Sequence, residues 1–222
     1  MEVQIRQIHK KYRNKKVLTD ISLTAQGGSC IGILGCNGSG KSTLLSILAG
    51  VLNPDGGSFL CDGKDLFRDH GLRSRLVGYV PQGTPLIEEL SAKDNLLLWY
   101  TPQQLEEELK NGVLKLLGID AFLKTPVRKL SGGMKKRLSI GCAVAGHPPI
   151  LLLDEPTAAL DLVCKQSIAA YLQQHKRSGG LILLTTHDVP ELELCDSWYI
   201  IRNGKLEPFC YDGDLHKLVE SL

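Results

Sequence analysis

Residues 35–43 read Gly-Cys-Asn-Gly-Ser-Gly-Lys-Ser-Thr and directly follow an apolar run at residues 30–34. Glycine adopts backbone conformations that other residues avoid, so glycines at this spacing favour a tight loop. The loop opens a predicted helix at residues 42–49. An apolar strand, a glycine-rich loop and a helix in this order predict the first crossover of a parallel α/β fold.

The rest of the chain continues this alternation of apolar runs and amphipathic stretches. Continuous runs of Ile, Leu and Val are expected where both faces of a sheet are covered. The predicted strands are residues 30–34, 76–80, 150–153, 181–185 and 198–201. The first 25 residues alternate more strongly, which predicts antiparallel strands at the edge of the sheet. The fold class is therefore α/β, with a mainly parallel sheet and an antiparallel β edge at the N-terminus.

The middle of the chain predicts helices. Residues 83–148 contain no convincing strand, and residues 105–109 and 113–117 have helical spacing. Ser91, with Asp94 three positions later, is typical of a helix start at which the Ser hydroxyl binds an orphan amide. A length of 222 residues suits one domain. We predict a single domain with a core of residues 1–82 and 149–222 and a helical subdomain at residues 83–148.

Charge gives no indication of a nucleic-acid partner. The 26 Lys and Arg residues nearly balance the 24 Asp and Glu residues, so the formal net charge is only +2. A basic stretch at residues 10–16 surrounds Tyr12, and we interpret its lysines as solvated. We therefore expect no binding to nucleic acid.

Cysteine usage and hydropathy predict a cytoplasmic protein. The seven cysteines include no CxxC pair and no Cys/His ligand spacing, which favours a reducing compartment over a disulfide framework or a zinc site. Residues 1–6 lack the design of a signal peptide. The longest apolar runs fall far short of the about 20 residues that cross a bilayer. Any membrane role should therefore come through a partner.

The glycine-rich loop fits the P-loop pattern, with its last glycine, Lys41 and Ser42 in register. The glycines let backbone N–H groups converge on phosphate oxygens, and the helix amino end adds partial positive charge. Lys41 can reach the β- and γ-phosphates of ATP, and the Ser42 hydroxyl is a ligand for Mg²⁺. The predicted nucleotide-binding residues of this P-loop NTPase core are Gly35, Cys36, Asn37, Gly38, Ser39, Gly40, Lys41, Ser42 and Thr43.

A second half of the site is predicted where the apolar run at residues 150–153 ends in Asp154 and Glu155. Ligands of α/β folds bind at the carboxyl edge of the sheet, where such residues project. Asp154 suits a Mg²⁺ site, and Glu155 is placed to act as the general base toward water.

A third motif, Leu130-Ser131-Gly132-Gly133-Met134, lies just upstream of that acidic strand end. Ser131 is expected to cap a helix, and the two glycines expose N–H groups at its positive end. The motif resembles the signature sequence of ATP-binding-cassette (ABC) proteins, usually Leu-Ser-Gly-Gly-Gln. In that family the signature contacts the γ-phosphate of ATP that is held by the P-loop of the opposite subunit.

Further segments are similar to ABC motifs in the order of the family. Thr186-His187-Asp188 resembles the switch-histidine loop, which places His187 on the γ-phosphate. Gln82 resembles the Q-loop glutamine, which senses Mg²⁺ and water. The resemblance thus implies a catalytic set of Glu155, His187, Gln82 and Lys41, and a Mg²⁺ site of Ser42, Gln82 and Asp154.

The same resemblance implies a dimeric transport ATPase. Asp161 matches the D-loop, which crosses to the other subunit, and Tyr12 matches the aromatic that stacks on adenine, with Val17 at the same nucleotide. Two ATP molecules would lie between two head-to-tail subunits, forming a homodimer or a heterodimer. Residues 83–90 would contact an integral membrane permease subunit on the cytoplasmic face of the membrane.

One departure from the family pattern suggests to which branch of the ABC proteins the chain belongs. Met134 replaces the usual Gln, and a signature with Met and a following basic triplet resembles exporter branches for drugs, lipids or polysaccharides. The triplet Lys135-Lys136-Arg137 could alternatively be a solvated helix face. Cys36 stands at a P-loop position that is often Pro, and the favoured interpretation is a small residue that the loop tolerates. The alternative hypothesis is that the surrounding backbone amides and Lys41 make its thiol reactive.

The alternative function is a non-transport ABC ATPase, for example in iron–sulfur assembly. The DNA-repair branch inserts a long coiled coil between P-loop and signature, and no heptad tract is present there. A pseudo-ATPase is disfavoured because Lys41, Asp154, Glu155 and His187 are all present.

Overall fold

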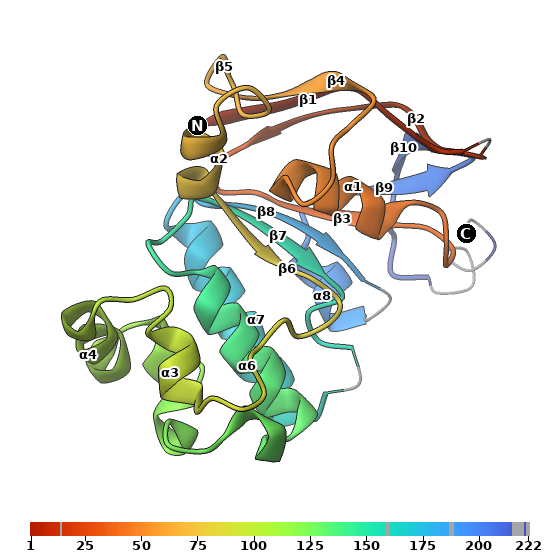
Figure 1. Cartoon of the computed structure of the whole chain (residues 1–222). Helices are drawn as coiled ribbons and strands as arrows, with labels where there is room; N and C mark the ends of the chain where they lie inside the picture. Colours follow the sequence, from red (N-terminus) through yellow and green to blue (C-terminus); the bar gives the residue numbers. More distant parts are fainter. Residues whose placement is uncertain (14, 159, 187–188, 215–219, 221–222) are drawn as a thin grey trace.

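The computed structural model describes residues 1–13, 15–158, 160–186, 189–214 and 220. Two β-sheets lie on either side of helix α1 (Lys41–Ala49), and further helices cover the opposite face of the larger sheet (Figure 1). This layering places α1 between the two sheets, and the loop before it at the carboxyl edge of the larger sheet.

The larger sheet has the strand order β10-β9-β3-β8-β7-β6. Its strands are β3 (Cys30–Leu34), β6 (Val77–Val80), β7 (Ile150–Asp154), β8 (Leu181–Thr185), β9 (Ser197–Arg202) and β10 (Lys205–Phe209). All neighbours are parallel except β10, which pairs antiparallel with β9. Every strand predicted from an apolar run is present, and the mainly parallel α/β fold is confirmed.

The N-terminal strands form a sheet of their own. β1 (Glu2–Tyr12) and β2 (Lys15–Gln26) pair antiparallel as predicted, but they join β4 (Gly56–Cys61) and β5 (Lys64–Asp65) rather than the larger sheet. The buried face of this sheet packs on α1, where Ile5, Phe59 and Leu48 share one core with Ile33 of β3. The antiparallel edge strand of the larger sheet is β10.

Helices α6 (Gly132–Ala143) and α7 (Leu162–Arg177) cover the other face of the larger sheet, and shorter helices lie beyond α6 (Figure 1). The shorter elements are α3 (Ala92–Leu96), α4 (Pro102–Asn111), α5 (Val113–Leu116) and the 3₁₀ turns Ile119–Phe122 and Val127–Lys129. The predicted capping box starts α3, since the Ser91 hydroxyl accepts from the Asp94 amide at 3.1 Å. α2 (His70–Leu76) and α8 (Val189–Leu194) are short connections.

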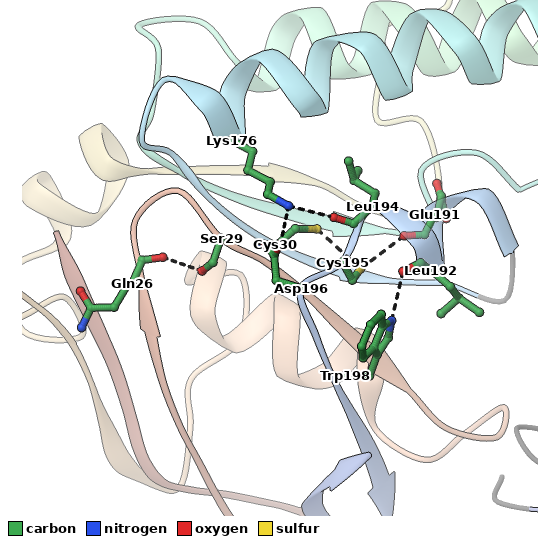
Figure 2. Close-up of polar contacts among 10 residues, drawn as sticks. All are labelled: Gln26, Ser29, Cys30, Lys176, Glu191, Leu192, Leu194, Cys195, Asp196 and Trp198. Carbon is green, nitrogen blue, oxygen red and sulfur yellow. Dashed lines mark hydrogen bonds and ion pairs between the residues drawn. The ribbon is translucent and has the colours of Figure 1, made fainter. Parts of the chain in front are cut away.

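Contacts between the first residue of β3 and the segment after α8 stabilise the larger sheet at the amino end of β3 (Figure 2). The Cys30 amide donates to Asp196 at 2.8 Å, and Lys176 of α7 forms a 2.6 Å ion pair with the same carboxylate. The thiols of Cys30 and Cys195 are buried and 3.6 Å apart. The hydrogen bond with Cys195 and burial raise the pKa of the Cys30 thiol, which makes it a structural rather than a reactive group.

Candidate functional site

The glycine-rich loop joins β3 to α1 at the carboxyl edge of the larger sheet. Gly40 caps α1 with φ at 112°, and a Cβ there would lie 2.8 Å from Leu18 Cδ2. A Cβ at Gly35 would lie 2.6 Å from Ser39 Oγ. The loop therefore requires glycine at both positions. As in any α-helix, the amides of the first turn of α1 lack intrahelical acceptors. Such a helix start is a site for anions.

Lys41 is the first residue of α1 and is only 6% exposed. Its ammonium donates to the carbonyls of Gly35 at 2.6 Å and Cys36 at 3.2 Å, which holds it inside the loop. Burial lowers the pKa of Lys41, whereas the charges of Glu155 and Asp154 raise it. A buried ammonium beside orphan amides forms strong, charge-assisted hydrogen bonds to phosphate oxygens.

The acidic pair lies at the end of β7, and Thr185 of β8 holds both members. The Thr185 hydroxyl donates to Asp154 at 2.6 Å, and the Glu155 amide donates to the Thr185 carbonyl at 3.1 Å. Asp154 is 2% exposed, and Glu155 has a φ of 48°, a conformation that is unfavourable outside glycine. The Gln82 amide donates to Glu155 Oε2 at 3.1 Å. This contact brings the predicted Q-loop residue to the predicted base.

A cleft of about 460 Å³ lies between the loop and the acidic pair. Its lining consists entirely of predicted site residues: Tyr12, Val17, Asn37, Gly38, Gly40, Lys41, Ser42, Thr43, Gln82 and Glu155. Tyr12 is 45% exposed at the end of β1, so its ring is open to a ligand. Gly35, Cys36, Ser39 and Asp154 do not line the cleft. His187 lies outside the described residues.

The predicted signature residues lie elsewhere, at the amino end of α6. Ser131 caps this helix as predicted, since its hydroxyl accepts from the Met134 amide at 3.2 Å. Ser131 and Gly132 are exposed, whereas Gly133 is buried against Cys164 of α7.

Asp161, the predicted D-loop residue, starts α7 beside the predicted signature residues. Its carboxylate accepts from the Cys164 amide at 2.9 Å. This bond and one from the Cys164 thiol hold the pKa of Asp161 below its usual range. None of Ser131, Gly132, Gly133, Met134 and Asp161 lines the cleft of the same chain.

Sequence reasoning missed two residues that support the site. Thr185 was predicted only as the last residue of a strand, although a hydroxyl at the end of an apolar run was a signal. Lys136 is 5% exposed, so the alternative interpretation of the basic triplet as a solvated helix face is wrong for this residue. Its ammonium instead donates to the carbonyls of Pro81 and Gln82.

The residues around the cleft fit Mg²⁺ together with a nucleotide. Ser42, Gln82 and Asp154 offer oxygen donors, which are the ligands that Mg²⁺ prefers. No three His, Cys, Asp or Glu residues of the described chain gather into a metal site of their own. A Mg²⁺ ion there would therefore complete its shell with phosphate and water. The buried hydroxyl of Ser39, which does not line the cleft, has no hydrogen-bond partner among the described residues.

Comparison with known proteins agrees with this geometry. The family model described as ABC transporter matches residues 18–158. A probable sulfate/thiosulfate import ATP-binding protein CysA of Chlorella vulgaris is 34% identical over 93% of this chain and 89% of its own length. A Nod factor export ATP-binding protein I of Sinorhizobium fredii is 34% identical over 98% of this chain, which spans 64% of that protein.

Solved structures show the same architecture. A dimeric ATP-binding cassette in a post-hydrolysis state, bound to ADP and Pi, superposes with a TM-score of 0.80. It is 27% identical, over 92% of this chain and 96% of that chain. None of the helices in the described part of the present chain has the length and hydropathy needed to cross a membrane.

Proposed function

Because this chain belongs to the ABC transporter family as an ATP-binding subunit that hydrolyses ATP, we propose that its cleft binds Mg·ATP and that two such subunits drive a separate membrane permease. The observation that carries the proposal is the cleft itself. One wall consists of the P-loop with Lys41, and the other carries Glu155 in contact with Gln82. A phosphate chain bound to the first wall faces the base on the second.

Each residue then has a defined task in hydrolysis. The loop amides and Lys41 bind the β- and γ-phosphates and stabilise the charge that develops during phosphoryl transfer. Glu155 accepts a proton from the attacking water, and Gln82 keeps that carboxylate oriented through the 3.1 Å hydrogen bond. His187 is assigned to the γ-phosphate. Ser42, Gln82 and Asp154 would hold Mg²⁺, which would neutralise charge on the phosphates.

The position of the signature supports a head-to-tail dimer. Ser131 and Gly132 are exposed at the helix start, where amides favour anions, yet they do not line the cleft of their own chain. A second subunit, either a copy or a homologue, would bring its P-loop and ATP to them. Because each γ-phosphate would then bridge two subunits, ATP stabilises the dimer and ADP releases it.

The permease contact is proposed at residues 83–90, which follow Gln82. Exposed apolar side chains lie in and near this segment, namely Ile87 at 45%, Leu98 at 58% and Trp99 at 64% exposure. The Asn95 side chain joins the two regions, since it binds the amide and the carbonyl of Ile87 at 2.9 and 3.1 Å. Docking here would place the subunit peripherally on the cytoplasmic face of a membrane.

We propose export as the direction of transport. The support is Met134 with the basic triplet after it, and the similar proteins include one named for export and one named for import. Inside-out vesicles with the co-purified permease would decide the question, because an exporter accumulates cargo in the lumen when ATP is added. Release of preloaded cargo would show import.

The ATPase site is tested by Glu155→Gln in the full chain. We expect the variant to bind ATP as the wild type does, to lose turnover by about 100-fold or more, and to form a dimer in ATP. Glu193→Gln, which removes an exposed carboxylate of α8, is the matched control and should turn over normally. Unchanged turnover in Glu155→Gln would contradict the assignment of the base.

The transporter role is tested by tagging the chain in its native cell and identifying what co-purifies from membranes in mild detergent. A polytopic membrane protein without its own cassette is the expected partner. If the tagged chain is absent from membranes and binds only soluble proteins, the permease proposal is wrong.

A further inference from the structure

Lys136 is a buried lysine whose ammonium binds main-chain carbonyls. It lies one turn inside α6, is 5% exposed, and donates to the Pro81 carbonyl at 3.0 Å and the Gln82 carbonyl at 3.1 Å. Burial of an ammonium is costly unless hydrogen bonds and nearby charges compensate. Such a group needs an explanation beyond helix packing, which an apolar side chain would serve better.

Two of the three carboxylates that act on Lys136 belong to the hydrolytic centre. Burial lowers the pKa of Lys136, whereas the carboxylates of Asp154, Glu191 and Glu155 raise it. Lys41 interacts with the same acidic pair of Asp154 and Glu155. The acidic pair is thus influenced by two ammonium groups, of which only Lys41 lies in the P-loop.

Lys136 also completes a continuous path from the signature to the base. Ser131 caps α6, and Lys136 of the same helix holds the Gln82 backbone. The Gln82 side chain in turn holds Glu155 at 3.1 Å. An α-helix is rigid over so short a stretch, so a displacement of its amino end moves Lys136 with it.

We propose that Lys136 is a positioning residue for ATP hydrolysis, which fixes Gln82 relative to the signature end of α6 so that Gln82 presents its amide to Glu155. This inference rests on the proposed function, because it assumes that Glu155 is the base. Lys136 touches neither nucleotide nor water in this role. It makes the geometry of the base depend on the position of the helix that faces the other subunit.

The test compares steady-state Mg·ATP hydrolysis by full-length Lys136→Met, Lys136→Arg and Gln82→Ala, singly and as the double variant Gln82→Ala with Lys136→Met. We expect Lys136→Met to lower kcat about tenfold or more, with KM changed by less than about threefold. Lys136→Arg retains charge and donors and should restore kcat to within about threefold of the wild type. In the Gln82→Ala background, Lys136→Met should lower kcat by less than about twofold. Both substitutions interrupt the same chain of contacts from Lys136 through Gln82 to Glu155, so the second has little left to remove.

Lys135→Met is the matched control on the same helix. Its ammonium pairs with Glu88 at 2.8 Å and contacts no part of the cleft, so its turnover should equal that of the wild type. Circular dichroism and melting temperature verify folding, and Lys136→Leu, which also lacks a donor, replaces Lys136→Met in every comparison if the latter does not fold. Turnover of Lys136→Met within twofold of the wild type, or multiplicative effects with Gln82→Ala, would overturn the inference. Absence of turnover in the wild type would instead overturn the proposed function.

Discussion

Gln82 and Glu155 are 73 residues apart in the chain, yet the amide of one donates to the carboxylate of the other at 3.1 Å. The contact follows from strand register. β6 and β7 are parallel neighbours in which Val80 pairs with Leu153, and each of the two functional residues stands two positions beyond its paired residue. The sheet therefore delivers both side chains to the same point of its carboxyl edge.

Removal of the Gln82 side chain should release Glu155 from this orientation. For Gln82→Ala we expect kcat to fall about 10- to 100-fold while KM for ATP changes little, because a misoriented base loses part of the about 100- to 10,000-fold that a well-placed general base contributes. Phosphate release at saturating Mg·ATP measures the effect. Gln173→Ala, an exposed position of α7, is the control. A kcat equal to that of the wild type would show that Glu155 needs no partner at this site.

Local signals explain which elements were predictable. The residues of β3 and β8 matched the apolar runs at 30–34 and 181–185 because both strands are buried on both faces. Helix starts at Ser91 and Ser131 followed from side chains that cap amides within one turn. The P-loop was predictable for the same reason, since its glycines and Lys41 act within a few residues.

Long-range arrangement was not predictable from these signals. The alternation of apolar and polar residues in β1 and β2 predicted a pair of strands at the edge of one sheet. Their place in a separate sheet depends on the pairing of β1 with β4, which lies beyond α1 in the chain. The role of Lys136 depends on the packing of α6 beside β6, and within a basic triplet nothing local distinguishes a buried lysine from a solvated one. The Gln82 contact likewise required strand order, which local sequence does not specify.

Gly40→Ala should destabilise the fold and weaken ATP binding together. The substituted residue would keep a φ of 112°, and its Cβ would lie 2.8 Å from Leu18 Cδ2 and 3.1 Å from Val17 Cγ1. Strain and overlap of this kind cost about 2 kcal/mol or more in the free energy of unfolding. Urea denaturation of the chain without nucleotide measures this energy.

Gly83→Ala is the matched control for that measurement. A Cβ at Gly83 meets no atom within 4 Å, so its free energy of unfolding should stay within about 1 kcal/mol of the wild type. Equal unfolding energies for the two variants would mean that the loop relaxes around a side chain at residue 40.

ATP affinity should decrease as pH rises in the alkaline range. In the protein without nucleotide, burial lowers the pKa of Lys41 below its ordinary value of 10.5. Bound phosphate favours the protonated ammonium. Above the lowered pKa the complex therefore holds more protons than the free protein, so Kd rises with pH, by about tenfold per pH unit at most. Calorimetric titrations in buffers of different ionisation enthalpy should show proton uptake on binding. Lys41→Met should bind weakly and lose the slope; an unchanged slope in this variant would assign the proton to another group.

The thiol of Cys36 should be the site at which alkylation inactivates the enzyme. Cys36 is exposed in the P-loop, and its carbonyl accepts from the Lys41 ammonium at 3.2 Å. A thioether formed there by N-ethylmaleimide adds bulk next to the phosphate-binding lysine, so turnover should fall and excess ATP should protect. Cys210 is also exposed, and Cys210→Ala should remain as sensitive as the wild type. Cys36→Ala should resist the reagent, because the other five cysteines are buried or half-buried and react slowly. Equal inactivation of Cys36→Ala would place the damaging thiol outside the P-loop.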